Sequence, residues 1–306
     1  MRVSQKTKLK PDFLIVGMQR SGTVWTGALL NSHPEIACFP NTKFHSKLVK
    51  SKIGDVDFFN TLASIEPKAD PRFTRPIERY RTMYDTLFAD LVPYKDTVPR
   101  WKFYSLMQER YSDYCNKRRG RKKIVGENTA DYIFHLDFID YLYPGIKKIC
   151  IIRDPKDKIV SWHFSLVHKG RRKEKRVTAG FVSDYLRNRI IPEYEALLAY
   201  DNHIHCITYE KLSTDGPRVT AGILDYLGVK KSPAIIARML ADASFKKQTK
   251  KDGGIARERG EEDKTSQLRK GMVGDWENYM TKEMAYKIDT AVAPLRKAVF
   301  KKYDIS

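Results

Sequence analysis

The sequence predicts an α/β protein, a single domain with a central parallel sheet and helices on both faces. Short apolar runs of strand type alternate with longer segments whose apolar residues repeat at helical spacing. The run Ile149–Ile152 is apolar throughout, as strands buried on both faces of a parallel sheet are. Ligands of such sheets bind at the carboxyl ends of the strands, so we expect a site in the turns that follow them.

The first half of the chain is expected to hold one strand and several helices. A loose arm over residues 1–10 precedes the domain, which covers 11–306. An apolar run predicts a strand at 12–16, and helical spacing predicts a helix at 22–31. Prolines then separate segments that we expect to be mostly helical, at 43–64, 73–91 and 103–118.

The second half alternates more regularly. Three short apolar runs predict strands at 123–126, 148–152 and 204–208. Apolar residues at helical spacing predict the intervening and following helices, at 133–141, 156–167, 181–199, 217–240 and 282–302.

Composition indicates an ordinary globular protein of a reducing compartment. The chain has 306 residues, of which 42% are hydrophobic, and no apolar run approaches the length of about 20 residues that spans a membrane. No apolar segment follows the charged N-terminus, so we expect no secretory signal. The four cysteines lack the spacing of a disulfide framework or a metal site, which favours a cytoplasmic location.

The net charge is strongly positive, at +20 from 57 Lys and Arg against 37 Asp and Glu. Such a field attracts anions, among them nucleotides, nucleic acid, acidic lipid and acidic polysaccharide, without choosing among them. The basic run 169–176 fits either a solvated loop or a flexible flap that contacts an anionic ligand.

The strongest signal is the turn after the first strand, Gly17-Met-Gln-Arg-Ser-Gly22. Between a strand and a helix, such a turn aims backbone N–H groups and a helix N-terminus at one point, which suits a phosphate. The glycine spacing matches a Walker A loop, but Thr23 and Val24 replace its lysine and its magnesium-binding hydroxyl. We therefore expect a P-loop NTPase-like fold whose phosphate cradle works without a metal.

Two later segments have the same character. Arg153 ends a strand, Pro155 begins a helix, and Ser161 lies two turns further, so an arginine fork and a hydroxyl could hold a second phosphate. Asp154 also allows a Walker B interpretation, with magnesium. Near the C-terminus, Arg269-Lys270-Gly271 could close over a phosphate; it follows a polar stretch, 246–265, that we expect to be mobile.

Taken together, these segments resemble the sulfotransferases that use 3′-phosphoadenosine 5′-phosphosulfate (PAPS). The first turn is similar to the family's 5′-phosphosulfate loop, Arg153 and Ser161 to its 3′-phosphate pair, and Arg269–Trp276 to its RKGxxGDW signature. The resemblance implies a nucleotide site that leaves 3′,5′-adenosine bisphosphate (PAP) as product, needs no metal, and is formed by Gln19, Arg20, Ser21, Gly22, Thr23, Val24, Trp25, Arg153, Ser161, Tyr209, Arg269, Lys270 and Gly271.

The reaction so implied moves a sulfuryl group to a hydroxyl or amine of an acceptor. Arg20 would stabilise the departing phosphate, while Trp25 and Tyr209 would lie beside the adenine. The aromatic and basic residues between 43 and 118 are expected to form the acceptor pocket. They would suit a small molecule, a lipid or a carbohydrate, and a transient contact with a membrane surface stays open.

The general base is harder to place. The family's acid after the His-Pro that ends the first helix has no counterpart here, so His45 is the candidate, and Glu127 and Asp131 are the alternatives. Glu127 and Asp131 lie in a segment that resembles an element of carbohydrate sulfotransferases.

Two other functions compete with this one. A P-loop kinase or nucleotidase would use Mg-ATP, which the missing magnesium hydroxyl disfavours. A non-enzymatic binder of nucleic acid or another acidic surface would explain the charge, but no nucleic-acid module is recognisable, and we expect no nucleic-acid partner.

Overall fold

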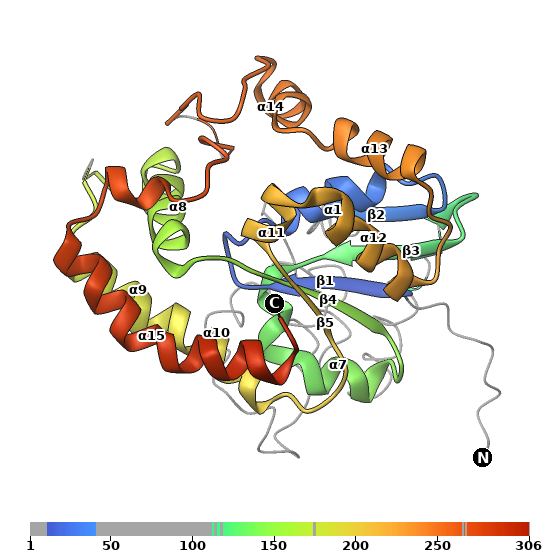
Figure 1. Ribbon diagram of the computed structural model, residues 1–306, viewed down its shortest axis with the longest axis horizontal. Helices are drawn as coiled ribbons and strands as arrows, with labels where there is room; N and C mark the ends of the chain where they lie inside the picture. Colours follow the sequence, from blue (N-terminus) through green and yellow to red (C-terminus); the bar gives the residue numbers. More distant parts are fainter. Residues whose placement is uncertain are drawn as a thin grey trace, which may run out of the picture.

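The computed structural model describes residues 11–40, 112, 115, 116, 119–173, 176–264, 266 and 268–305. Its strands pair in parallel in one sheet of order β2-β3-β1-β4-β5 (Figure 1). The strands are β1 (Phe13–Gly17), β2 (Ile36–Pro40), β3 (Ile124–Asn128), β4 (Lys147–Ile152) and β5 (His205–Thr208). The predicted class, an α/β domain around a central parallel sheet, is confirmed.

Strand β1 lies in the middle of the sheet and is buried on both sides. Phe13 and Ile15 belong to one core, and Leu14 and Val16 belong to the other, all four without exposure to solvent. Since successive side chains of a strand point to opposite faces, two cores sandwich the sheet. This explains why the strands read as continuous apolar runs.

Helices build the remainder of both cores (Figure 1). The first core is completed by α1 (Thr23–Asn31), α11 (Tyr209–Thr214), α12 (Gly216–Leu227) and α13 (Pro233–Asp242). The second core is completed by η2 (Ala130–His135), α7 (Leu136–Leu142), α8 (Pro155–His168), α9 (Ala179–Tyr185), the π-helical segment η3 (Leu186–Ile190), α10 (Ile191–Ala199) and α15 (Lys282–Lys302). Two short helices lie nearer the turns, α14 (Phe245–Gly253) and η4 (Asp275–Asn278).

Several predicted elements need correction. Strand β2 was not predicted: it follows Pro34 by two residues and ends in Pro40, and among the described strands it pairs only with β3. The helix predicted at 217–240 is two helices: Gly228 ends α12 with a φ of 72°, and Ser232 caps α13. Most of α14 falls in the stretch 246–265, for which no helix was predicted.

Other predictions lie beyond the structural description. The arm over residues 1–10 and the helices predicted at 43–64 and 73–91 lie outside the described residues, and the helix at 103–118 lies almost wholly outside them. In the described part of the chain, none of the helices combines the length and apolar character of a membrane span. The four cysteines are free thiols.

Candidate functional site

The turn between β1 and α1 holds Arg20 at the carboxyl end of the sheet. Ser21 N donates to Met18 O at 3.1 Å, which closes a four-residue turn, and Arg20 has a φ of 68°. Gly22 has a φ of 103°, and a Cβ there would lie 2.8 Å from the ring of Tyr209. Position 22 therefore requires glycine, since other residues avoid this φ and the ring leaves no room.

The guanidinium of Arg20 faces helix α8. Its Nε donates to Ser161 Oγ at 3.1 Å. Burial first, with smaller contributions from the charges of Arg153 and Arg269, lowers the pKa of Arg20 to about 10. Arg20 thus stays charged at neutral pH, and the three arginines lie within electrostatic reach of one another.

Arg153, at the end of β4, connects the turn to the C-terminal segment. Its Nη2 donates to Met272 O at 2.8 Å, and its Nη1 donates to Arg20 O at 3.4 Å. The guanidinium also lies 4.2 Å from the ring centroid of Tyr209, a cation–π arrangement. Arg153 is therefore held between the first turn and the segment that contains Met272.

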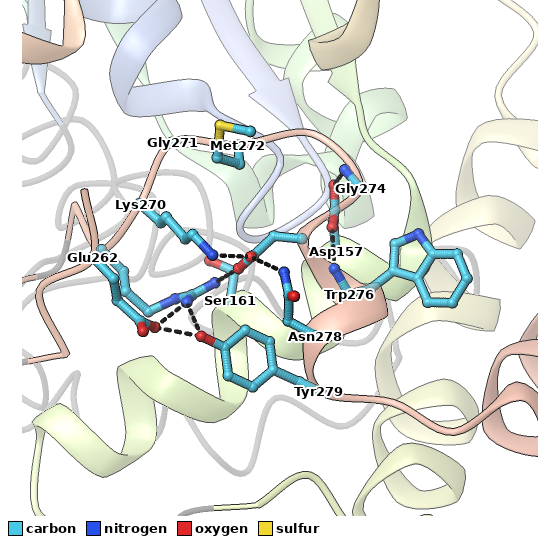
Figure 2. Close-up of polar contacts among 12 residues, drawn as sticks. Asp157, Ser161, Glu262, Lys270, Gly271, Met272, Gly274, Trp276, Asn278 and Tyr279 are labelled. Carbon is cyan, nitrogen blue, oxygen red and sulfur yellow. Dashed lines mark hydrogen bonds and ion pairs between the residues drawn. The ribbon is translucent and has the colours of Figure 1, made fainter. Parts of the chain in front are cut away.

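Asp157 anchors the C-terminal segment and was missed by the sequence analysis, which treated it as part of a helix start. Its buried carboxylate accepts from Gly274 N at 2.9 Å and from Trp276 N at 3.0 Å (Figure 2). Burial raises the pKa of Asp157, against the charge of Arg153. The only signal in the sequence was an acid in the first turn of the helix after Pro155.

Arg269 and Lys270 converge on one carboxylate. Lys270 Nζ donates to Asp275 Oδ1 at 2.6 Å, and Arg269 forms an ion pair with the other oxygen of Asp275 (Figure 2). Arg269 also pairs with Glu262 and donates to the hydroxyl of Tyr279 at 3.1 Å. These contacts fix both cations at one side of the turn that begins at Gly271.

Aromatic rings form another wall. The rings of Trp25 and Tyr209 lie edge to face with centroids 5.3 Å apart, and Trp25 Nε1 donates to Ala243 O at 3.0 Å. The guanidinium of Arg259 lies 4.7 Å from the ring centroid of Trp25. Phe245, at the start of α14, and Arg259 were not anticipated from the sequence.

A cavity of about 460 Å³ joins these groups. Of the residues predicted to bind the nucleotide, all except Ser21 line it, and Ser21 is buried beneath. Seven basic and three acidic side chains contribute to the lining, so its charge is positive. The basic ones are Arg20, Arg153, Lys169, Lys251, Arg259, Arg269 and Lys270.

The candidates for the general base differ in position. Asp131 lines the cavity and forms an ion pair with Arg189. Glu127 is buried, where its Oε1 accepts from the hydroxyls of Tyr132, at 2.5 Å, and Thr129, at 3.0 Å, and it does not line the cavity. His45 lies outside the described residues.

The carboxylate that a Walker B interpretation needs, that of Asp154, does not face the cavity. Asp154 caps α8, accepting from Lys156 N at 2.8 Å, and is not part of the cavity lining. Over the described ranges, no three His, Cys, Asp or Glu residues gather closely enough to hold a metal ion.

Comparison with known proteins decides the family. The family model of the sulfotransferase domain matches residues 10–302 of this chain. The chain belongs to the sulfotransferase domain family. The predicted resemblance is thereby confirmed for nearly the whole length of the chain.

Curated relatives of this sulfotransferase-family chain are distant. Cytosolic sulfotransferase 17 of Arabidopsis thaliana is 27% identical over 172 residues, which are 47% of this chain and 48% of that protein. Sulfotransferase 2A1 of Rattus norvegicus is 23% identical over 188 residues, 58% of this chain and 64% of that one. The matches thus span half to under two thirds of the length of these relatives.

Solved structures share the fold of this sulfotransferase-family chain. Mouse sulfotransferase SULT7A1 complexed with PAP superposes with a TM-score of 0.54 at 16% identity, covering 93% of this chain and 83% of that one. A sulfotransferase from Alicyclobacillus acidocaldarius superposes with a TM-score of 0.53 at 16% identity, covering 97% of both chains. At such identities the likeness establishes the fold alone.

The donor groups of the cavity fit a doubly phosphorylated nucleotide. Arg153 lines the cavity, and its buried Nε has no hydrogen-bond partner within the described part of the chain. Buried donors without partners are uncommon in folded proteins, and an oxygen of an anionic ligand would satisfy this one. The excess of basic side chains would balance the ligand's charge.

Arg153→Ala is expected to weaken PAP binding at least about tenfold, because a charged hydrogen-bond donor and the stack on Tyr209 are both lost. Calorimetric titration with PAP measures the change in Kd. Arg218→Ala is the matched control, since Arg218 is exposed and pairs only at the surface with Asp215. An Arg153→Ala variant that binds PAP as tightly as the control would contradict the assignment.

Proposed function

We propose that this protein transfers a sulfuryl group from PAPS to a hydroxyl or amine of an acceptor. The observation that carries the proposal is the meeting of Arg20, Arg153 and Arg269, from three distant segments, on one cavity at the carboxyl ends of the strands. Membership of the sulfotransferase domain family supports the same activity.

The first turn is proposed to act on the reacting end of the donor, which supplies an activated sulfuryl group. Arg20 and the N–H groups at the start of α1 stabilise the negative charge that develops on the departing phosphate. The hydrogen bond from Arg20 to Ser161 holds the guanidinium inside the cavity, so little reorganisation is needed. No metal is required in this role, because the protein supplies the counter-charge.

The remote end of the nucleotide is assigned to the other two segments. Arg153 and Ser161, with Arg269 and Lys270, hold the 3′-phosphate, and this binding energy orients the reacting end. Trp25 and Tyr209 offer ring faces and edges against which an adenine can pack.

The acceptor is proposed to be a small molecule, a lipid or a carbohydrate, reached without nucleic-acid binding. The cavity continues past the nucleotide residues to Ala130 and Asp131 after β3, and to Trp162 on α8 and Lys169 just after it. This supports a second substrate at that end. The four free thiols support a reducing, cytoplasmic location.

Labelled PAPS tests this function directly. Incubation with a panel of phenols, sterols, sugars and amines is expected to give a labelled product and PAP, with and without a chelator of divalent ions. ATP hydrolysis that depends on magnesium, together with no transfer from PAPS, would replace the proposal with the kinase or nucleotidase.

His45 is proposed as the general base that takes the acceptor's proton. His45→Ala is expected to lower the turnover number about a hundredfold or more, the usual contribution of such a base, and to leave PAP affinity unaltered. The matched control is His203→Ala, since His203 is exposed and its ring lies tilted against that of Tyr226, and neither residue lines the cavity. Retained turnover would move the assignment to Asp131, then to Glu127.

A further inference from the structure

A fully buried carboxylate lies against the first turn. Glu193, on α10, has no exposure to solvent, and its Oε1 accepts from Gln19 N at 3.0 Å. Lys158 Nζ on α8, equally buried, donates to Glu193 Oε2 at 2.5 Å. Arg189 Nε donates to Oε1 at 2.9 Å. The carboxylate therefore links two helices to the backbone of the turn.

The turn itself needs such support. Arg20 is its third residue and has a φ of 68°, a conformation that residues other than glycine seldom adopt. The peptide between Met18 and Gln19 is held at both ends, because its carbonyl accepts from Ser21 N and its N–H donates to Glu193. The orientation of this peptide plane directs the backbone into Arg20 and so sets the position of its side chain.

Through Arg189, the Glu193 carboxylate is also connected to the acceptor side of the cavity. Arg189, which lies in the π-helical segment η3, bonds Glu193 and also forms an ion pair with Asp131. Asp131 lines the cavity beyond the nucleotide residues. Burying an ion pair gains little net stability, so stability alone gives no strong reason for this arrangement.

We propose that Glu193 is a positioning residue: through Gln19 N it holds the Met18–Ser21 turn, and with it Arg20, in the orientation that binds the phosphosulfate group. Lys158 and Arg189 fix the carboxylate that does this. The inference rests on the proposed placement of the phosphosulfate at this turn.

Glu193 could matter as the acceptor for Gln19 N or only as the counter-charge of Lys158, and two double variants distinguish these roles. Glu193→Gln with Lys158→Met keeps an oxygen that can accept from Gln19 N, whereas Glu193→Leu with Lys158→Met removes it. Both remove the same two charges, and apolar pairs commonly replace buried ion pairs without loss of stability. Glu193 Oε1 also accepts from Arg189 Nε, so Arg189→Met is added to both variants, which then differ in the acceptor for Gln19 N.

The readouts are the Kd for PAP, the turnover number from PAPS, and Tm. The Gln-containing pair is expected to bind PAP and turn over about tenfold better than the Leu-containing pair, the effect of one hydrogen bond, at a Tm equal within a few degrees. Equal binding and turnover by the two pairs would overturn the proposal. Wild-type protein that binds no PAP would instead overturn the proposed function.

If the variant with Glu193→Leu and Lys158→Met does not fold, the variant with Glu193→Met and Lys158→Met, in the same Arg189→Met background, takes its place. This second apolar pair is expected to behave as the leucine pair would, with weaker PAP binding in a folded protein. If neither apolar pair folds while the Gln-containing pair does, the bond to Gln19 N supports the fold and not the site, and the proposal fails.

Discussion

Arg20→Ala is expected to lower the turnover number by about a hundredfold to a thousandfold, the effect of removing a preorganised donor from a developing negative charge. Arg20 is half-buried at the cavity wall, charged, and hydrogen-bonded through Nε to Ser161. The two other arginines predicted at the site have partners of their own, Arg153 in Met272 O and Arg269 in Asp275. The assay is transfer from labelled PAPS to the acceptor that the screen identifies.

The fold is expected to survive this change, since the positive φ at position 20 is no worse for alanine than for arginine. Arg20→Lys is the matched control, because it keeps the charge while losing the planar fork, and should retain more activity than alanine. Circular dichroism and Tm establish that both variants are folded. Turnover by folded Arg20→Ala within about tenfold of the wild type would remove Arg20 from the leaving-group role.

Asp157→Ala is expected to produce the second large effect, a combined loss of stability and of PAP binding. Gly274 N and Trp276 N lose their acceptor, and Arg153 loses the carboxylate 3.4 Å away. Leaving such buried groups unpaired costs about 3 kcal/mol, or several degrees in Tm. Because the C-terminal segment carries Arg269 and Lys270, its release also weakens PAP binding.

Thermal unfolding and PAP titration measure the two effects in one preparation. Asp225→Ala is the matched control: Asp225 and its partner Lys231 are both exposed, and loss of a surface pair changes stability by less than about 1 kcal/mol. Asp157→Asn keeps one oxygen and should fall between alanine and wild type. An Asp157→Ala variant with the Tm and PAP affinity of the Asp225 control would show that the segment is held elsewhere.

The parts of the fold that followed from the sequence are those with local signals. The helix predicted at 282–302 has the same bounds as α15. Thr281 caps its first turn, and its apolar residues keep helical spacing. Strands β1 and β4 were evident from unbroken apolar runs. Strand β2 was missed because its short apolar run ends in Pro40, and the partner that the structure describes for it, β3, is distant in sequence.

Some residues of the candidate site likewise had local signals in the sequence, and others had none. The chemistry of the turns, with Arg20, Arg153 and Arg269 beside glycines and hydroxyls, was legible in the sequence because phosphate-binding turns have short, local patterns. Phe245, Arg259 and Asp157 had no such pattern, since each gains its role from a contact far along the chain, as Asp157 does with Gly274.

The sequence by itself determined the class of fold and the family, and it predicted which residues hold two phosphates, because these depend on periodicity and on motifs a few residues long. Only the tertiary structure decided that those residues share one cavity, that Asp154 is a helix cap, and that Glu193 and Lys158 are buried against the first turn. Those facts depend on how α8 and α10 pack around the carboxyl end of the sheet, and the packing of distant segments leaves no mark in local spacing.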